Sequence, residues 1–141
     1  MRHIILTLTL LFSISSFGQT GEVIRYYSNG AVDWKGNYVN GKAQGKVIGY
    51  YRSGAVKRKI NYIDNIQQGE AIWYYENGVI SSKTNYVDAR MHGESIEYYE
   101  SGEIKEIQHN QDGYTIKEIE YYESGEIKEI RNYKDGWLVK D

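Results

Sequence analysis

The chain offers few of the side chains that catalyse reactions or bind metals. It has no cysteine, which excludes disulfides, zinc knuckles and thiol catalysis together, and it has only three histidines. His92 and His109 do not stand at a spacing that places two imidazoles on one metal ion. Ser53 and Ser101 stand in turn segments without a base positioned beside them, so nucleophilic catalysis has no support. We therefore expect no metal, no cofactor and no catalytic residue.

Carboxylates offer one further chemistry, because paired acidic residues can act as general acid and general base. Six glutamates come from two copies of the segment ESGEIKEI: Glu100, Glu103, Glu106, Glu123, Glu126 and Glu129. Repetition of that segment accounts for their recurrence, so we interpret them as part of a solvated strand. The sequence predicts a protein that is not an enzyme.

The repetition extends through the chain. Tyrosine pairs fall at positions 26/27, 50/51, 74/75, 98/99 and 121/122, so successive pairs lie 24, 24, 24 and 23 residues apart. An isoleucine stands two residues before each pair and a glycine three residues after it. A further tyrosine closes each unit at positions 38, 62, 86 and 133, where the fourth unit has Asn110. A fixed period of this length is typical of repeat arrays.

Each unit has the pattern of a β-hairpin. Ser28–Gly30 has turn chemistry, and a second turn is expected at Asn40–Gly45. The residue missing between units four and five is expected to fall in a turn, at Gly113–Ile116. We expect the isoleucine, the first tyrosine, the following Val or Ile and the closing tyrosine to share one face. The other face would carry the second tyrosine of each pair together with Lys35, Lys59 and Lys83.

The predicted fold class is therefore all-β, an elongated antiparallel β-hairpin repeat array of about five 24-residue units in a single-sheet meander of about ten strands. Residues 1–18 differ from the repeats. They have a short basic start, an apolar run from Ile4 to Ile14, and small residues at Ser16 and Gly18, as in a secretory signal peptide. The expected domains are a signal peptide, 1–18, and a repeat domain, 19–141, with units at 21–44, 45–68, 69–92, 93–115 and 116–141. Export to the periplasm, the cell surface or the medium follows from that hypothesis.

Charge is distributed unevenly along the repeats. The formal net charge of −2 argues against a nucleic acid partner. Residues 21–68 carry eight Lys or Arg against three Asp or Glu, a net charge of +5. Residues 69–115 carry three against nine, a net charge of −6, and residues 116–141 five against seven, a net charge of −2. The basic end could engage an anionic partner or lipid, or opposite ends could attract each other between molecules.

The unit G-x-x-x-x-Y-Y-x-x-G-x-[VI]…Y…G resembles the variant MORN repeat of bacterial proteins of the YwqK type, which are often labelled antitoxins. The resemblance covers residues 21–136. It implies a MORN-like hairpin array, a role in protein–protein contact, no enzymatic activity, and association of some members with membranes. Export of this chain departs from the pattern of an antitoxin acting in the cytoplasm. An immunity or surface-contact role outside the cell therefore stands beside the antitoxin role.

Three functional hypotheses follow. The first is protein binding through the sheet. Its expected interaction surface is the contact row of second tyrosines together with three lysines: Tyr27, Tyr51, Tyr75, Tyr99, Tyr122, Lys35, Lys59 and Lys83. The second is a glycan- or choline-binding surface module that uses rows of tyrosine rings. The third is peripheral attachment to an anionic membrane through a basic patch of Lys57, Arg58 and Lys59. The first strand, EVIRYY, is also a candidate edge for self-association.

Overall fold

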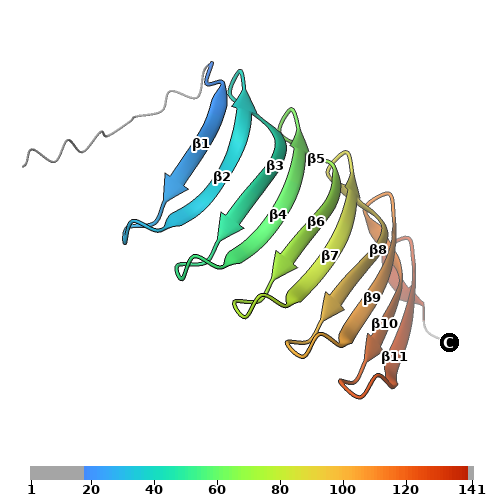
Figure 1. The fold of residues 1–141 in the computed structure, drawn as a ribbon. Coiled ribbons are helices and arrows are strands. Elements are labelled where there is room, and N and C mark those ends of the chain that lie inside the picture. Colours follow the sequence, from blue (N-terminus) through green and yellow to red (C-terminus); the bar gives the residue numbers. More distant parts are fainter. Residues whose placement is uncertain (1–17, 140–141) are drawn as a thin grey trace, which may run out of the picture.

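The computed structural model describes residues 18–139, which form one antiparallel sheet without any helix (Figure 1). The predicted all-β meander is confirmed. The strands are β1 (Gly21–Tyr26), β2 (Val32–Val39), β3 (Lys42–Tyr50), β4 (Val56–Ile63), β5 (Ile66–Gln67), β6 (Gly69–Tyr74), β7 (Ile80–Val87), β8 (Arg90–Tyr98), β9 (Ile104–Gln111), β10 (Tyr114–Tyr121), β11 (Ile127–Lys134) and β12 (Trp137–Val139). There are twelve strands rather than ten because β5 is a short separate piece beside β4 and β12 begins a sixth unit. The proposed signal peptide lies outside the described residues, apart from Gly18.

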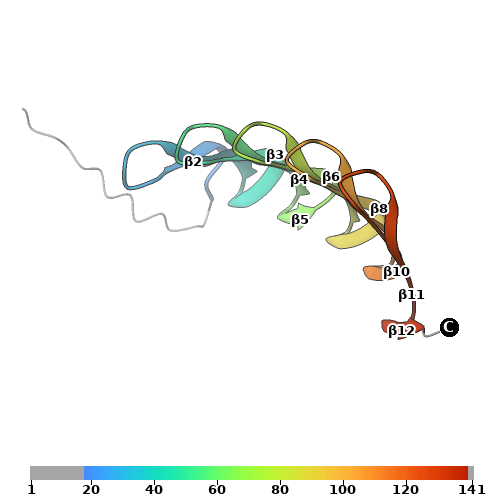
Figure 2. The same cartoon turned by 90° about the horizontal axis from the view of Figure 1, so that it is seen from below.

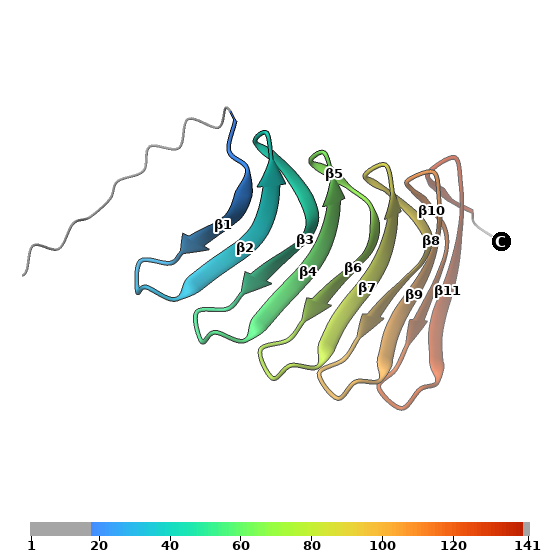
Figure 3. The same cartoon turned by 45° about the horizontal axis from the view of Figure 1, so that its top comes forward.

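Strands adjacent in sequence are adjacent in the sheet, with β5 off the main path. Figure 3 shows the hairpins side by side, with their wider turns along one edge of the strip and their tight turns along the other. Figure 2 shows that the strip is bent, so that β10–β12 turn away from the line of the first strands. A right-handed twist between neighbouring strands accumulates in this way in long open sheets.

The wide turn of each hairpin is built on the second tyrosine and the glycine three residues later. In the first unit the Gly30 amide donates to the Tyr27 carbonyl at 3.0 Å, and the Tyr27 amide donates to the Ala31 carbonyl at 2.8 Å. Gly30 has a φ of 86°, a conformation that glycine adopts at no steric cost. The same two hydrogen bonds recur in all five units, which confirms the predicted turns and explains the constant distance between tyrosine and glycine.

The tight turns have two central residues with positive φ, as in a type I′ turn. These pairs are Asn40–Gly41, Asp64–Asn65, Asp88–Ala89, Asp112–Gly113 and Asp135–Gly136. The turn is therefore shorter than the predicted Asn40–Gly45. Gly45 instead lies inside β3 with a φ of 73°, where the pairing with β2 shifts register at a β-bulge.

The bulge also explains the short fourth interval. Between β2 and β3, pairing passes from Lys35 with Ile48 to Asn37 with Gln44, so β3 contributes two additional residues. Between β9 and β10 the same shift uses only one additional residue, at Ile116. The deletion therefore falls in a strand bulge, whereas the sequence predicted that it falls in a turn. A bulge can lose a residue because that residue has no ladder partner.

Cross-strand pairing shows which side chains share a face, because residues directly opposite each other point the same way. One continuous row comprises Ile24, Lys35, Ile48, Lys59, Ile72, Lys83, Ile96, Ile107, Ile119 and Ile130. We call this side the isoleucine face. The sequence predicted that Lys35, Lys59 and Lys83 lie on the other face from the isoleucines. That prediction is wrong, because the three lysines lie in the isoleucine row. Each hairpin contributes two strands to the row, and the wide-turn bulge shifts the second strand by one residue.

The opposite side, which we call the tryptophan face, carries Trp34, Trp73 and the closing tyrosines. Its most buried side chains are small or branched: Val23 is 9% exposed, Ile60 9%, Ala43 5% and Ala71 0%. The closing tyrosine Tyr38 pairs with Gly21 and Ala43 on this side, so the closing tyrosines do not share a face with the isoleucines, in contrast to the prediction. The sheet is a single layer, and its limited interior lies along this face.

Asn110 replaces the closing tyrosine in the fourth unit and is 5% exposed. Its amide nitrogen donates to the Ser95 hydroxyl at 2.9 Å, and its oxygen accepts a hydrogen bond from the Thr115 hydroxyl at 2.9 Å. A small hydrogen-bonded network thus stands where the other units pack an aromatic ring. Burying the amide is tolerable because its polar atoms have partners.

Ala89 is the one tight-turn residue without the freedom of glycine or the local hydrogen bonding of Asn and Asp, although its φ is 61°. Left-handed backbone costs an L-residue such as alanine about 1–2 kcal/mol, whereas glycine adopts it freely but loses more chain entropy on folding. We expect Ala89→Gly to raise the free energy of unfolding by about 0.5–1 kcal/mol in urea titrations. The control Ala55→Gly, at a position without positive φ, should lower it. Equal effects of the two substitutions would contradict the assignment.

Candidate interaction surface

The second tyrosines link successive hairpins. The Tyr27 hydroxyl donates to the Tyr50 carbonyl at 2.7 Å, and the Tyr51 hydroxyl donates to the Tyr74 carbonyl at 2.6 Å. Tyr75 and Tyr99 make the equivalent bonds to the carbonyls of Tyr98 and Tyr121, at 2.7 and 2.8 Å. Each ring therefore reaches from the wide turn of one unit to the backbone of the next, and the four rings are half-buried.

A second set of links runs along the tight-turn edge. The Asn65 amide donates to the Ala43 carbonyl at 3.1 Å, and the Asn65 side-chain oxygen accepts from the Ala43 amide at 2.6 Å. Ala89 and Gly113 repeat the backbone bond to carbonyls in β5 and β8, and Gly41 donates to the carbonyl of Gln19, just before β1. Within the first four units, both edges of the strip thus tie neighbouring units together.

These bonds change the interpretation of the predicted contact row. Four of its five tyrosines hold the array together, and only Tyr122, in the last unit, is exposed, at 50%. Arg52 lies over the Tyr27 ring at 5.1 Å and Lys57 over the Tyr51 ring at 5.5 Å, so cations cover two of the rings. The sequence indicated the row but not the hydroxyl acceptors, which come from the next unit.

The predicted lysines and the predicted basic patch divide between the two faces. Lys35, Lys59 and Lys83 lie in the isoleucine row, and Lys59 sits 5.1 Å from the centre of the Tyr74 ring. Arg58 pairs with Gly49 and so lies on the tryptophan face. The structure therefore does not bring Lys59 and Arg58 together on one surface, because consecutive strand residues point to opposite sides.

A row on the tryptophan face has the composition of a binding surface. Trp34, Gly49, Arg58 and Trp73 are successive cross-strand partners. A Cβ placed on Gly49 would lie 3.0 Å from the Arg58 Cγ and Nε, so the arginine side chain lies across the glycine. The guanidinium therefore has an aromatic residue on each side of it in the row. Tryptophan and arginine are the side chains that most often dominate binding energy.

The two tryptophans occupy unrelated positions in the repeat, since Trp34 belongs to the second strand of its hairpin and Trp73 to the first strand of another. For this reason the repeat alignment alone did not place them together. Cross-strand register brings them into one row.

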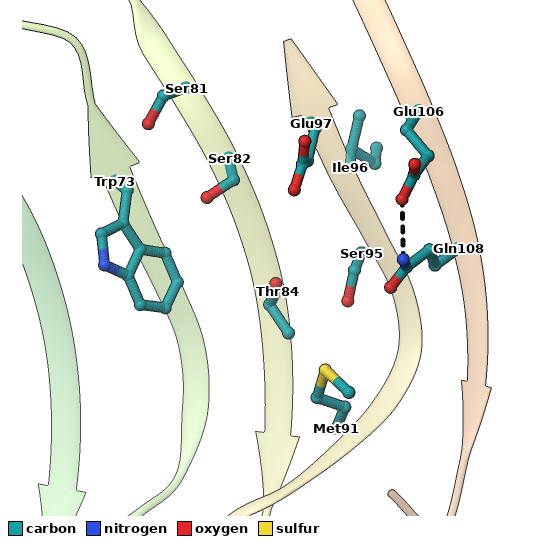
Figure 4. Close-up of a pocket in the computed structure, with 10 residues that line it drawn as sticks. All are labelled: Trp73, Ser81, Ser82, Thr84, Met91, Ser95, Ile96, Glu97, Glu106 and Gln108. Atoms are coloured by element: carbon teal, nitrogen blue, oxygen red, sulfur yellow. Dashed lines mark hydrogen bonds between the residues drawn. The ribbon is translucent and has the colours of Figure 1, made fainter. Parts of the chain in front are cut away.

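The same row continues into a shallow hollow of about 340 Å³ at the middle of the array (Figure 4). Its floor and walls include Trp73, Ser82, Thr84, Ser95 and Glu97, so hydroxyls dominate between the aromatic and the acidic ends. Figure 4 shows the Trp73 ring at one side of the hollow and Glu106 at the other, with Glu97 between them.

The row becomes acidic within the hollow, at Glu97 and Glu106, and continues beyond it with Glu120 and Glu129 as the next partners. Burial raises the pKa of the Glu106 carboxyl, and the carboxylates of Glu118 and Glu97 raise it further, against a hydrogen bond from the Gln108 amide at 2.7 Å. Glu106 is half-buried, in contrast to the solvated strand that the sequence indicated. Cations offset part of the repulsion, since Lys105 lies 3.3 Å from Glu97 and Lys128 lies 2.6 Å from Glu120.

Arg131 stands in the adjacent row at the end of the acidic region. Its guanidinium donates to the carboxylates of Glu118 and Glu129 and lies 3.4 Å from Glu120. The hydrogen bond to Glu129 is the first cause that holds the pKa of Arg131 above its usual range, and the carboxylate of Glu118 raises it further. The tryptophan face thus changes along the array from basic and aromatic, through hydroxyl, to acidic.

Two further properties of the described residues bear on function. No group of three or more His, Cys, Asp or Glu side chains in residues 18–139 is arranged to hold a metal ion. No helix in that part of the chain is long and apolar enough to cross a membrane.

Comparison with protein families follows the same repeat. The family described as MORN repeat variant matches five segments, at residues 19–40, 43–64, 67–88, 91–110 and 114–135. The chain belongs to the MORN repeat variant family. MORN repeats are generally repeats through which proteins contact other proteins or membranes. No curated protein matches the chain.

In this MORN array the hydroxyl links should contribute measurably to stability. Tyr51→Phe removes one link and leaves the half-buried Tyr74 carbonyl without that donor, so we expect a loss of about 0.5–1.5 kcal/mol in the free energy of unfolding. Tyr50→Phe is a matched control, because the hydroxyl of Tyr50 makes no such bond to any residue within 18–139. Urea titration of dilute protein measures both, and equal losses would contradict the role of the Tyr51 hydroxyl.

The raised pKa of Glu106 predicts a pH dependence. The folded protein binds this proton more readily than the unfolded chain, so the contribution is fully present below the unfolded pKa and is lost as pH rises through the folded pKa. Glu106→Gln removes the ionised form, and we expect it to stabilise the protein at neutral pH and to have less effect in acid. Glu100→Gln, in an exposed turn, is the control. Thermal unfolding across pH measures both, and a gain that does not vary with pH would contradict the prediction.

Proposed function

We propose that the chain is an exported, non-enzymatic scaffold that binds a protein partner through its tryptophan face. The graded surface supports this role most directly. Trp34, Arg58 and Trp73 offer aromatic and guanidinium contacts at one end, and Glu97 and Glu106 offer carboxylates at the other. A partner with acidic groups facing Arg58 and basic groups facing the glutamates would be complementary in charge.

This proposal moves the contact row away from the tyrosines. Rings whose hydroxyls already bond the backbone would have to break a link between units to reach a partner with that group. The side chains of Trp73 and Arg58 carry no comparable structural bond among the described residues. Contact through them would leave the links between units intact.

The segment with the layout of a signal peptide supports export, and the generally interactive role of MORN repeats supports binding. Antitoxin-like or immunity-like action is one form that such binding would take, with the toxin as the bound protein. An adjacent toxin gene in the source genome would favour this form. In an exported protein, the toxin would be met outside the cytoplasm.

The test is capture of a partner on immobilised protein from extract of the cells that make it. The proposal expects one stoichiometric protein, with Trp73→Ala and Arg58→Gln each weakening its binding by about 2 kcal/mol, roughly thirty-fold. Lys83→Gln, on the isoleucine face, is the matched control and should bind as the unaltered chain does. Capture that survives both substitutions, or is lost only in the control, would contradict the assignment of the face.

A glycan- or choline-binding role is a second candidate, favoured by one observation. Two tryptophans in one row beside a hydroxyl-lined hollow resemble a surface on which sugar rings stack. Retention on polysaccharide or choline resin that Trp73→Ala abolishes and Tyr75→Phe does not would support this role. The division of Lys57, Arg58 and Lys59 between faces gives membrane attachment no comparable support, and salt-sensitive binding to anionic vesicles would be its sign.

A further inference from the structure

The two ends of the array are incomplete in complementary ways. Tyr122 holds the position of the hydroxyl donors in the first four units, yet its hydroxyl has no acceptor among residues 18–139, and the residue is 50% exposed. At the other end, Tyr26 holds the position of the acceptors Tyr50 and Tyr74. No tyrosine hydroxyl in the described chain reaches its carbonyl, and Tyr26 is 57% exposed. One end has a donor without an acceptor, and the other has an acceptor without a donor.

The backbone shows the same complementarity. β11 pairs with β10 along one edge, but on its other edge β12 covers only Asn132–Lys134. The rest of that edge, at 127–131, has no strand beside it among the described residues. Among the described strands, β1 in turn pairs with β2 alone. An open strand edge is a template for another strand.

The register of the repeat predicts which residues of a second copy would lie beside the open edge of β11. β10 lies on β9 with Ile119 opposite Ile107 and Glu120 opposite Glu106. The equivalent residues are Ile24 and Arg25 in β1, and Ile130 and Glu129 in β11. A β1 strand added to β11 in this register therefore continues the isoleucine row with an isoleucine. On the tryptophan face it places Arg25 directly across from Glu129. Glu129 ends a row of glutamates in which it pairs with Glu120, and Glu120 pairs with Glu106.

We propose that a second copy of this chain adds its β1 to β11 in the register of the repeat, so that copies join end to end. The Tyr122 hydroxyl then donates to the Tyr26 carbonyl of the incoming copy. Because the two surfaces in the contact differ, each joint leaves one free β1 and one free β11, and the assembly is an open filament.

The charge distribution favours this order of ends. Residues 21–68 carry a net charge of +5, and residues 69–115 and 116–141 carry −6 and −2, so unlike ends attract and like ends repel. Arg25 is available for the contact, since its side chain is 69% exposed and its ion pair with Asp33 is long, at 3.8 Å. Contact between two copies of the same end would instead oppose charges of one sign.

β12 must give way for the joint to form. The Gln19 carbonyl accepts from Gly41 as the Ala43 carbonyl accepts from Asn65. In the proposed joint, the residues just before β1 would therefore lie where β12 pairs with β11. β12 has only three paired residues, and Trp137 is 80% exposed. A short strand that covers part of an edge is displaced at small cost by a longer one. β12 thus limits assembly in the free molecule.

Sedimentation velocity of the full chain over a range of protein concentrations tests the proposal. The unaltered chain should form a concentration-dependent series of oligomers that recedes at high salt. Arg25→Glu alone and Glu129→Arg alone should each remain monomeric, because each brings like charges together at the joint. An equimolar mixture of the two, and the double variant, should both recover the series, since opposite charges meet again. Circular dichroism confirms that each variant is folded.

Three results would overturn the proposal. They are a monomer at all concentrations of the unaltered chain, assembly by either single variant equal to that of the unaltered chain, and a mixture of single variants that stays monomeric. Two further variants test the details. Tyr122→Phe should weaken association several-fold without changing the fold, and removal of residues 137–141 should strengthen it. If that truncation instead weakens association, β12 is part of the joint and the displacement is wrong.

Discussion

The structure depends on contact between neighbouring hairpins. A single-layer sheet has no second layer to cover it, so the units cannot be stable one by one. The links that hold the units in phase are specific: a tyrosine hydroxyl to the next unit's carbonyl on one edge, and a turn amide to the preceding strand on the other. Between these edges, the isoleucine row and the small buried residues of the tryptophan face pack across each strand junction. Because a link joins only adjacent units, the Tyr122 hydroxyl and the Tyr26 carbonyl have no such partner among residues 18–139.

The same regular register creates the candidate binding surface. Because neighbouring units are in phase, residues from successive strands line up in one row. Differences in residue type between units therefore change the character of the face along the array. At the row of Arg58 and Glu106, that change runs from cation and indole to carboxylate. Repulsion between carboxylates at the acidic end contributes to the raised pKa of Glu106. Nearby cations, above all Arg131, offset part of that repulsion. The charged and aromatic side chains of this row do not form the hydrogen bonds that link the units. This agrees with the recognition role proposed for the row.

Much of the fold could be predicted from the sequence. The period of the tyrosine pairs gives the length of each hairpin unit, and the glycine three residues after each pair marks the wide turn. The faces could not be predicted. Two bulges in each unit shift the register. The wide-turn bulge adds a residue between Val32 and Trp34, so a count of residues from Val32 to Tyr38 assigns Lys35 and Tyr38 to the wrong side. The row of Trp34 and Trp73 was hidden for a related reason: it alternates between first and second strands of different hairpins, and an alignment of units separates those positions. The acceptors of the tyrosine hydroxyls are backbone carbonyls of another unit, which no side-chain pattern records.

The most direct measurement of the links between units is exchange of tyrosine hydroxyl protons with water, followed by NMR on dilute tyrosine-labelled protein. Hydroxyl protons of Tyr27, Tyr51, Tyr75 and Tyr99 should exchange slowly and show contacts to the following unit, whereas the Tyr122 proton should exchange rapidly. Uniformly rapid exchange at all five positions would show that the hydroxyls do not join the hairpins, and the account of how the array is held together would fail.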